Sequence, residues 1–166
     1  MPANTLEPWA HFFMTAAGVA AILAGLIVVA VAVSLQHILK YPHLPPRVRA
    51  TFSNLMLVVM TTLLGLVPQP VSAFAAEVVV FCAIGWTIVI ACQREIVEHH
   101  FKAGRPAAEL MIGLPGAHAA ILGFVAGSVL LWTANGDGLY WIMAGVVITL
   151  FSTMMNIWVF MVETMR

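Results

Sequence analysis

The sequence predicts an all-α membrane protein, a single domain over residues 1–166 with five transmembrane helices. The first observation is composition: 62% of the 166 residues are hydrophobic and 8% are charged, whereas a soluble domain has about 45–50% and about 25%. So small a chain could not cover that much apolar surface in water. The second observation is that five apolar stretches approach the roughly 20 residues of a spanning helix. Because these stretches are continuous rather than alternating, they exclude a transmembrane β-barrel.

The five expected spans follow one another through short connections. The first contains no proline, the second is stopped by Pro68, and the third meets no helix breaker before Gly104. The third helix is therefore expected to continue past the membrane to about residue 102. The expected spans are 9–36, 50–67, 72–92, 115–133 and 139–162. The pattern allows 106–113 either as a separate interfacial helix or as an early part of the fourth helix.

The basic residues indicate the orientation. With five spans, all seven lysines and arginines fall on the same side, and cytoplasmic loops carry the excess of these residues. The N-terminus is therefore expected outside and the C-terminus in the cytoplasm. The first cytoplasmic loop, HILKYPHLPPRVRA (37–50), is not expected to form a continuous helix because of its prolines. Its basic residues suit anionic lipid headgroups, so the lipid bilayer is their expected partner. These residues are Lys40, Arg47 and Arg49.

The most crowded polar stretch is CQREIVEHH (92–100). It falls at the cytoplasmic end of the third helix, where i,i+4 pairing favours a solvated helix end. The polar stripe comprises Glu95, Glu98, His99 and Lys102. A metal or pH-sensing site is the alternative, because Glu95 and His99 could share an ion with His37 or His43. Two ligands on one helix are too few, so the pattern favours the solvated helix end.

Small residues recur at every fourth position in two of the expected spans. Such rows let helix backbones approach closely in lipid. The first row is Ala17, Ala21 and Gly25, and the second is Ala119, Gly123 and Gly127. Contact within the chain and contact between subunits both fit the rows. Five short spans need internal packing, which favours contact within the chain.

Polar groups inside the spans are the leads to function, since they are costly in lipid. Asn54 lies in the second span and Asn156 in the fifth, where they either tie helices together or line a pathway. Glu77, the acid within the third span, has no basic residue on the outer side to pair with. It is expected either to reach water at the interface or to line the outer mouth of a cation pathway. His11, near the outer end of the first span, is the remaining pathway candidate.

Catalytic and cofactor motifs are not found in the sequence. It contains no P-loop, no G-x-S-x-G, no H-E-x-x-H and no C-x-x-C, so we expect no enzymatic activity. It also lacks a basic domain for nucleic-acid binding. His11 and His118 are expected at different depths in the membrane, which argues against a shared haem, and we expect no cofactor.

Four segments resemble a family of small bacterial inner-membrane proteins without a known activity. They are AGLIVVAVAVSLQHIL (24–39), P-x-L-P-P-R (42–47), GLYWIMAGVVITLF (138–151) and the tail N-x-W-V-x-x-V-E-x-x-R (156–166). The resemblance implies a multi-pass protein of the bacterial inner membrane. The residues themselves favour a chain that self-assembles into an oligomer and forms an ion, proton or small-solute pathway. The alternative is an accessory or assembly subunit of a larger membrane complex, and a metal- or haem-binding protein comes third.

Overall fold

The computed structural model describes residues 6–40, 44–102, 115–133 and 137–163, which lie in helices or in short turns. In chain order the helices are η1 (Glu7–Trp9), α1 (Ala10–Lys40), α2 (Leu44–Leu66), α3 (Val71–Lys102), α5 (Pro115–Trp132) and α6 (Gly138–Glu163). The prediction of an all-α fold is confirmed for this part of the chain. Residues 106–113 lie outside the described residues. The sequence allows them either as a separate interfacial helix or as an early part of the fourth helix.

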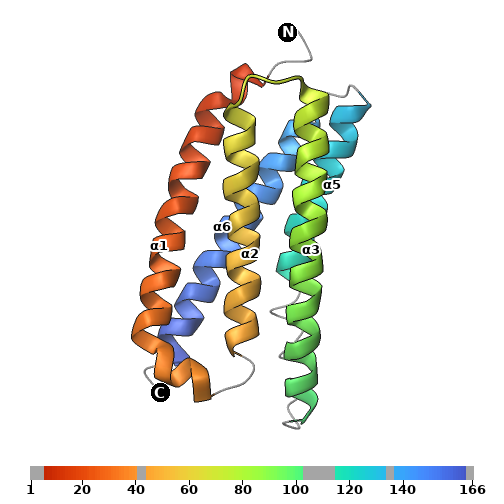
Figure 1. Cartoon of the computed structure of the whole chain (residues 1–166). Coiled ribbons are helices and arrows are strands. Elements are labelled where there is room, and N and C mark those ends of the chain that lie inside the picture. The colour runs from red at the N-terminus through yellow and green to blue at the C-terminus, as the bar shows by residue number, and fades with distance from the viewer. Residues whose placement is uncertain (1–5, 41–43, 103–114, 134–136, 164–166) are drawn as a thin grey trace.

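The helices form a bundle of two layers. In Figure 1, α1, α2 and α3 stand side by side and run antiparallel, and α6 crosses behind them at an angle with α5 beside it. The most extensive packing joins α5 to α6, α2 to α3 and α1 to α2. One end of the bundle holds the end of α1, the start of α2 and the end of α3. We call it the basic end, for the charges described below.

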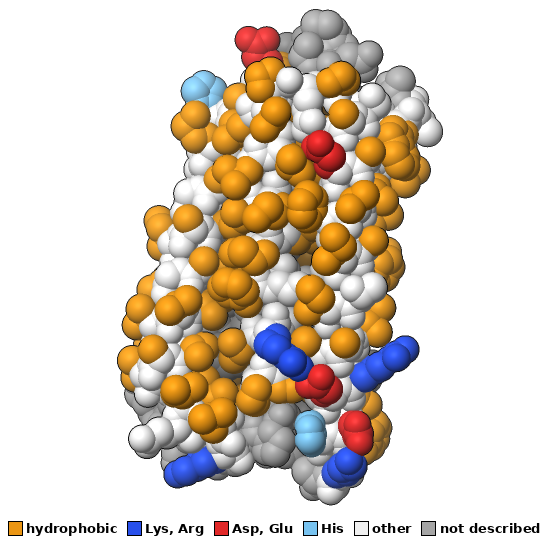
Figure 2. Space-filling view, viewed as in Figure 1, with side chains coloured by type: hydrophobic (Ala, Val, Ile, Leu, Met, Phe, Trp, Pro, Cys, Tyr) orange, Lys and Arg blue, Asp and Glu red, His pale blue; other side chains and the backbone are white. Residues whose placement is uncertain are grey.

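Four segments are long and apolar enough to cross a membrane: Glu7–Gln36, Leu44–Leu66, Val71–His99 and Gly138–Val159. Helix α5 is also apolar, but its 18 residues make a helix of about 27 Å, shorter than the roughly 30 Å of the hydrocarbon core. Large apolar side chains are exposed over the outside of the bundle, as Figure 2 shows for one face. The helices are therefore compatible with a membrane protein, and the fifth span stays a prediction.

Helix α2 begins before the second expected span, at Leu44 rather than at residue 50. Pro45 and Pro46 occupy the first turn of α2, and the expectation of no continuous helix through 37–50 is consistent with α1 ending at Lys40 and α2 beginning at Leu44. A proline in that position costs no helix hydrogen bond, because the first N–H groups of a helix have no partner within it. The early start places Arg47 and Arg49 on a helix, so that their side chains have defined directions.

The described lysines and arginines gather at the basic end. They are Lys40, Arg47, Arg49, Arg94 and Lys102. In Figure 2 the lysine and arginine side chains of the visible face lie in its lower half, where α2 begins and α3 ends. The charge of the described residues is thus one-sided. Which side of the membrane the basic end faces stays a prediction.

Aromatic side chains fill the core toward the opposite end. Phe13 of α1 and Phe74 of α3 are buried, with ring centroids 5.8 Å apart. Gly65 of α2 lies directly against Phe13, since a Cβ atom on this glycine would be 2.6 Å from Phe13 Cδ2. The missing side chain lets α1 and α2 approach, and the two rings close the centre of the bundle at this end.

Helices α5 and α6 meet through glycines. A Cβ atom on Gly123 would lie 3.1 Å from the Cα atom of Gly145, and one on Gly127 would lie 2.6 Å from the carbonyl oxygen of Gly138. Only glycine allows backbones to come this close. The small-residue row of α5 therefore packs within the chain at these two positions, while Ala119 at its start is exposed.

The small-residue row of α1 has a different environment. Ala17 is half-buried and Ala21 is exposed. Within the described part of the chain, nothing lies within 4 Å of the position that a Cβ atom would take on Gly18 or Gly25. Helix α1 packs mainly on α2 and α6, and this row points away from both. The same sequence pattern thus belongs to a helix–helix contact in α5 and to an open face in α1.

Candidate functional site

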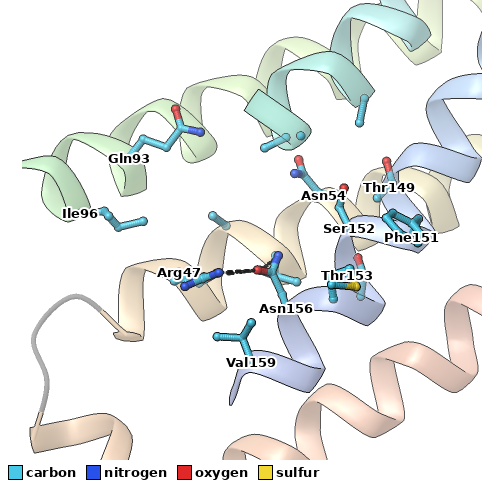
Figure 3. Close-up of a pocket in the computed structure, with 16 residues that line it drawn as sticks. Arg47, Asn54, Gln93, Ile96, Thr149, Phe151, Ser152, Thr153, Asn156 and Val159 are labelled. Atoms are coloured by element: carbon cyan, nitrogen blue, oxygen red, sulfur yellow. Dashed lines mark hydrogen bonds between the residues drawn. The ribbon is translucent and has the colours of Figure 1, made fainter. Parts of the chain in front are cut away.

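A polar cavity of about 290 Å³ lies between α2, α3, α5 and α6, toward the basic end. In Figure 3, polar side chains that line the cavity, such as Asn54, Ser152 and Asn156, lie close together where α2 and α6 approach each other. Its polar lining includes Arg47, Thr51 and Asn54 of α2 and Ser152, Thr153 and Asn156 of α6. Because the rest of the bundle is apolar, this gathering of polar groups is the best candidate for a functional site.

Helical periodicity places these side chains on shared faces. On α2, Arg47, Thr51 and Asn54 are spaced by four and three residues, and on α6 the residues from Thr149 to Asn156 repeat this spacing through Thr153. Positions separated by three or four residues lie on one side of a helix. The two polar faces meet where α6 crosses α2, and their meeting forms the cavity.

Arg47 and Asn156 are the centre of a hydrogen-bond network. Nε and Nη2 of Arg47 both donate to Asn156 Oδ1, at 3.3 and 3.1 Å, as the dashed line in Figure 3 indicates. Asn156 Nδ2 in turn donates to Thr51 Oγ1 at 3.2 Å, and this hydroxyl donates to the carbonyl oxygen of Arg47 at 2.9 Å. The closed set of bonds ties α6 to the first turns of α2 and holds the guanidinium in place.

Asn54 contributes an acceptor whose hydrogen-bonding capacity is not met. Its side chain is 9% exposed, and its buried Oδ1 atom has no hydrogen-bond partner among the described residues. Leaving a buried acceptor unsatisfied costs about 1–3 kcal/mol. Thr61 lies seven residues further along the same face of α2, and its buried Oγ1 atom also has no hydrogen-bond partner among the described residues. A bound molecule with a donor group in the cavity would satisfy Asn54.

His118 of α5 approaches the cavity through Gln93 of α3. The indole nitrogen of Trp86 donates to His118 Nδ1 at 3.0 Å, and His118 Nε2 lies 2.6 Å from Gln93 Oε1. An indole N–H can only donate, so the neutral imidazole carries its proton on Nε2 and donates it to Gln93. Sequence reasoning missed Trp86 and Gln93, because no local pattern indicated that they meet His118.

Arg47 is the charged residue among the described residues that line the cavity. The other polar groups are side-chain amides and hydroxyls, and the remaining lining is apolar. The described lining therefore offers a guanidinium together with neutral donors and acceptors, which are the groups that orient polar molecules in binding sites.

Two of the four pathway candidates meet in the cavity and two do not. Asn54 and Asn156 both line it. Glu77 lies toward the opposite end, where its Oε2 accepts a hydrogen bond from Gln69 Nε2 at 2.9 Å. Gln69 Nε2 also donates to the carbonyl oxygen near the end of α2, that of Leu64, at 3.1 Å. The sequence offers no basic partner for Glu77 on the outer side, and in the structure its carboxylate is instead hydrogen-bonded to a neutral amide. His11 is exposed on the first turn of α1.

The polar cluster at the end of α3 is divided between two ion pairs. Glu98 accepts from Lys102 Nζ at 2.7 Å, as the i,i+4 spacing predicted. Glu95 accepts from Arg49 Nη2 of α2 at 2.5 Å, a partner that its own helix could not indicate. Both pairs are exposed. His99 is half-buried beside them.

The metal-site alternative involves residues that are described only in part. His43 lies outside the described residues, as does the side chain of His37. Among the described side chains, no group of three or more histidines, cysteines, aspartates or glutamates is arranged to hold a metal ion. Glu95 has Arg49 as its partner.

The three residues assigned to lipid headgroups have different positions. Lys40 is exposed at the end of α1, and Arg49 is exposed but paired with Glu95. Arg47 is half-buried and lines the polar cavity. Arg47 donates to Asn156 because the helix that starts at Leu44 turns it toward α6, and its contact with a lipid headgroup stays a prediction.

Comparison of the chain with protein-family models, with curated proteins and with solved structures finds no match. The resemblance to small bacterial membrane proteins therefore stays a prediction, and the function has to be inferred from the cavity and the surface of this chain.

Proposed function

We propose that the chain is a multi-pass membrane protein that binds a small polar solute in the polar cavity, as the cytoplasmic half of a solute pathway. The single observation that carries the proposal is the cavity itself, in which Arg47, Asn54 and Asn156 meet inside an apolar bundle. Ionisable and amide groups at such a position are costly in a membrane protein, and they usually mark a binding site or pathway.

Polar groups continue inward from the cavity along α2. Thr61 follows Asn54 on the same face and is also buried with an unmet hydroxyl. Beyond it, Phe13 packs against Gly65 and Phe74. Between the cavity and the opposite end, the interior therefore contains the polar Thr61 and then the packed rings of Phe13 and Phe74. Passage of a solute through one chain would require these rings to move apart.

Access to the cavity can be measured with a cysteine in place of Ser152. In a background with Cys82→Ala and Cys92→Ala, we expect Ser152→Cys to react with a membrane-impermeant methanethiosulfonate reagent, because Ser152 is half-buried and lines the cavity. The reaction is expected in inside-out vesicles and not in intact cells, since the basic end is proposed to face the cytoplasm. The measurement is the rate of labelling, followed by mass spectrometry.

Ser128 is the matched control for this measurement. It is a fully buried serine whose hydroxyl donates to the carbonyl oxygen of Phe124 within α5. Ser128→Cys should therefore stay unlabelled in both preparations. Equal, negligible labelling of Ser152→Cys and Ser128→Cys would disprove an accessible cavity. Labelling of Ser152→Cys in intact cells instead would keep the cavity and reverse the orientation.

Self-assembly through α1 is a second candidate property, and a separate observation favours it. Gly18, Ala21 and Gly25 are exposed on α1, whereas Gly123 and Gly127 of the α5 row lie against α6. The natural occupant of such a row in lipid is another helix, because small residues permit close backbone contact. We propose a second copy of α1 as the occupant, which gives a homo-oligomer.

The oligomer is tested by Gly25→Leu. We expect this variant to keep its helical content, since no described residue has an atom within 4 Å of the added Cβ atom, and to lose self-association. The measurement is the mass of the detergent-solubilised particle by light scattering. Ala119→Leu, an exposed small residue of α5, serves as the control and should keep the wild-type mass. A wild-type particle of 17.9 kDa would contradict self-assembly, and co-purifying chains of other sequence would favour the accessory-subunit alternative.

A further inference from the structure

Asn54 places an unsatisfied acceptor in the wall of the polar cavity. The residue is 9% exposed, it lines the cavity from α2, and its buried Oδ1 atom has no hydrogen-bond partner among the described residues. An amide oxygen can only accept, so the group that satisfies it is an N–H or O–H donor. From this atom we infer that the solute is a small uncharged molecule with a hydrogen-bond donor, a hydroxyl or a primary amide, that binds at Asn54. This inference rests on the proposed function.

The state of Asn54 differs from that of Asn156, the other asparagine of the cavity. Asn156 Oδ1 accepts from Arg47 and its Nδ2 donates to Thr51, so this amide ties α6 to α2. Asn54 Oδ1 makes no such link within the described part of the chain. An acceptor that is buried without a donor lowers stability. A group that lowers stability without joining helices is typical of a binding site, where function offsets the loss.

Ser152 of α6 suits the same solute. In Figure 3, the side chains of Asn54 and Ser152 lie close together in the lining of the cavity. A Cβ atom on Gly116 would lie 3.1 Å from Ser152 Oγ, so this hydroxyl also faces the start of α5. A hydroxyl both donates and accepts. A solute whose donor meets Asn54 Oδ1 therefore finds a second polar partner on the neighbouring helix.

The described lining also limits the charge and the size of the solute. It contains no carboxylate, and a buried ammonium group needs such a partner because an unpaired charge is costly to desolvate. A carboxylate on the solute would bring no donor to Asn54 Oδ1. The cavity volume of about 290 Å³ lies near the lower end of the roughly 300–1,000 Å³ of small-molecule sites. Short polyols and small amides, such as glycerol and acetamide, meet these limits.

A series of acetyl compounds of similar size tests the inference by protection of Ser152→Cys, in the background that lacks both native cysteines. Acetamide carries an uncharged donor, acetamidinium carries a cationic donor, and acetate and N,N-dimethylacetamide carry none. We expect acetamide to slow labelling about threefold at about twice its dissociation constant, by mass action. The other three compounds should have less effect at equal concentration. Glycerol is measured beside them: protection by glycerol alone assigns a hydroxyl ligand, and protection by acetamide alone assigns an amide.

Two variants of Asn54 separate binding from structure. Asn54→Leu keeps the branched shape and removes the acceptor, so it should abolish protection while the thermal midpoint stays at or above that of wild type. Asn54→Asp should shift the preference to acetamidinium, because a carboxylate pairs with a cationic donor. Thr62→Val is the matched control. It removes a fully buried hydroxyl of the same helix that donates to the carbonyl oxygen of Val58, outside the described lining, and should leave protection unchanged.

Several results would overturn the inference. They are equal protection by acetamide and N,N-dimethylacetamide, stronger protection by acetamidinium than by acetamide in the presence of Asn54, and no protection by acetamide or glycerol. A lower thermal midpoint of Asn54→Leu with unchanged protection would assign Asn54 to structure. If Asn54→Leu does not fold, the solute series and Asn54→Asp still decide the question. Saturation-transfer NMR of the acetyl methyl group repeats the series on the wild-type chain, in which Ser152 is intact. Failure of Ser152→Cys to label at all would instead overturn the proposed function.

Discussion

Gly127→Leu is expected to prevent the bundle from folding. A Cβ atom on Gly127 would lie 2.6 Å from the carbonyl oxygen of Gly138 and equally close to Ile142 Cγ1. The carbonyl belongs to the backbone of α6 and cannot turn away, so α5 and α6 would have to separate. Overpacking of a core side chain costs about 1–3 kcal/mol, and separating two helix backbones should exceed this range. The measurement is the thermal midpoint of the detergent-solubilised protein by circular dichroism, with its elution volume.

Ala119→Leu provides the comparison within the same helix. Ala119 belongs to the same small-residue row of α5 but is exposed, so a larger side chain there meets no backbone. The thermal midpoint should stay within a few degrees of wild type. A normal midpoint for Gly127→Leu would show that the α5–α6 contact is not as close as the structure places it.

The second large effect is expected for Asn156→Leu. Leucine removes the oxygen that accepts two hydrogen bonds from Arg47 and the amide that donates to Thr51. A half-buried guanidinium would lose these two hydrogen bonds, which costs about 1–3 kcal/mol for a charged group. We expect a lower thermal midpoint, because the contact that ties α6 to the first turns of α2 would be lost.

Asn156→Asp separates the loss of a contact from the loss of a side chain. Aspartate has nearly the same shape and accepts from Arg47 as an ion pair, so stability should stay near wild type. An unchanged thermal midpoint in Asn156→Leu would contradict the role given to the Arg47–Asn156 contact.

Local physics was sufficient to predict the helices. Continuous apolar runs of about 20 residues form helices in lipid because each backbone group must be satisfied within its own segment. The start of the second helix, at Leu44 rather than at residue 50, could not be predicted because of Pro45 and Pro46. A proline is a breaker inside a helix but is accepted in the first turn, and the sequence alone did not show which of the two applied.

The members of the site could be suspected one at a time from the sequence, although their association could not. Asn54 and Asn156 were candidates because amides are costly in a membrane. Arg47 was assigned to lipid headgroups, and nothing in its neighbourhood indicated Asn156, which is 109 residues away. Two asparagines and an arginine share a cavity only because α6 crosses α2 with a particular rotation about its axis.

The two small-residue rows also show that spacing in the sequence does not decide which helix face is packed. Their spacing is identical, yet a Cβ atom on Gly127 would meet the backbone of α6, and one on Gly25 would meet no atom of the described residues within 4 Å. Composition and periodicity determined that the chain is helical and apolar, with its described basic residues at one end. These properties depend on each residue's own energy in lipid or water. The tertiary structure decided that Arg47 faces inward, that Glu77 meets Gln69 and that one glycine row is occupied, because such contacts depend on how whole helices are rotated and crossed.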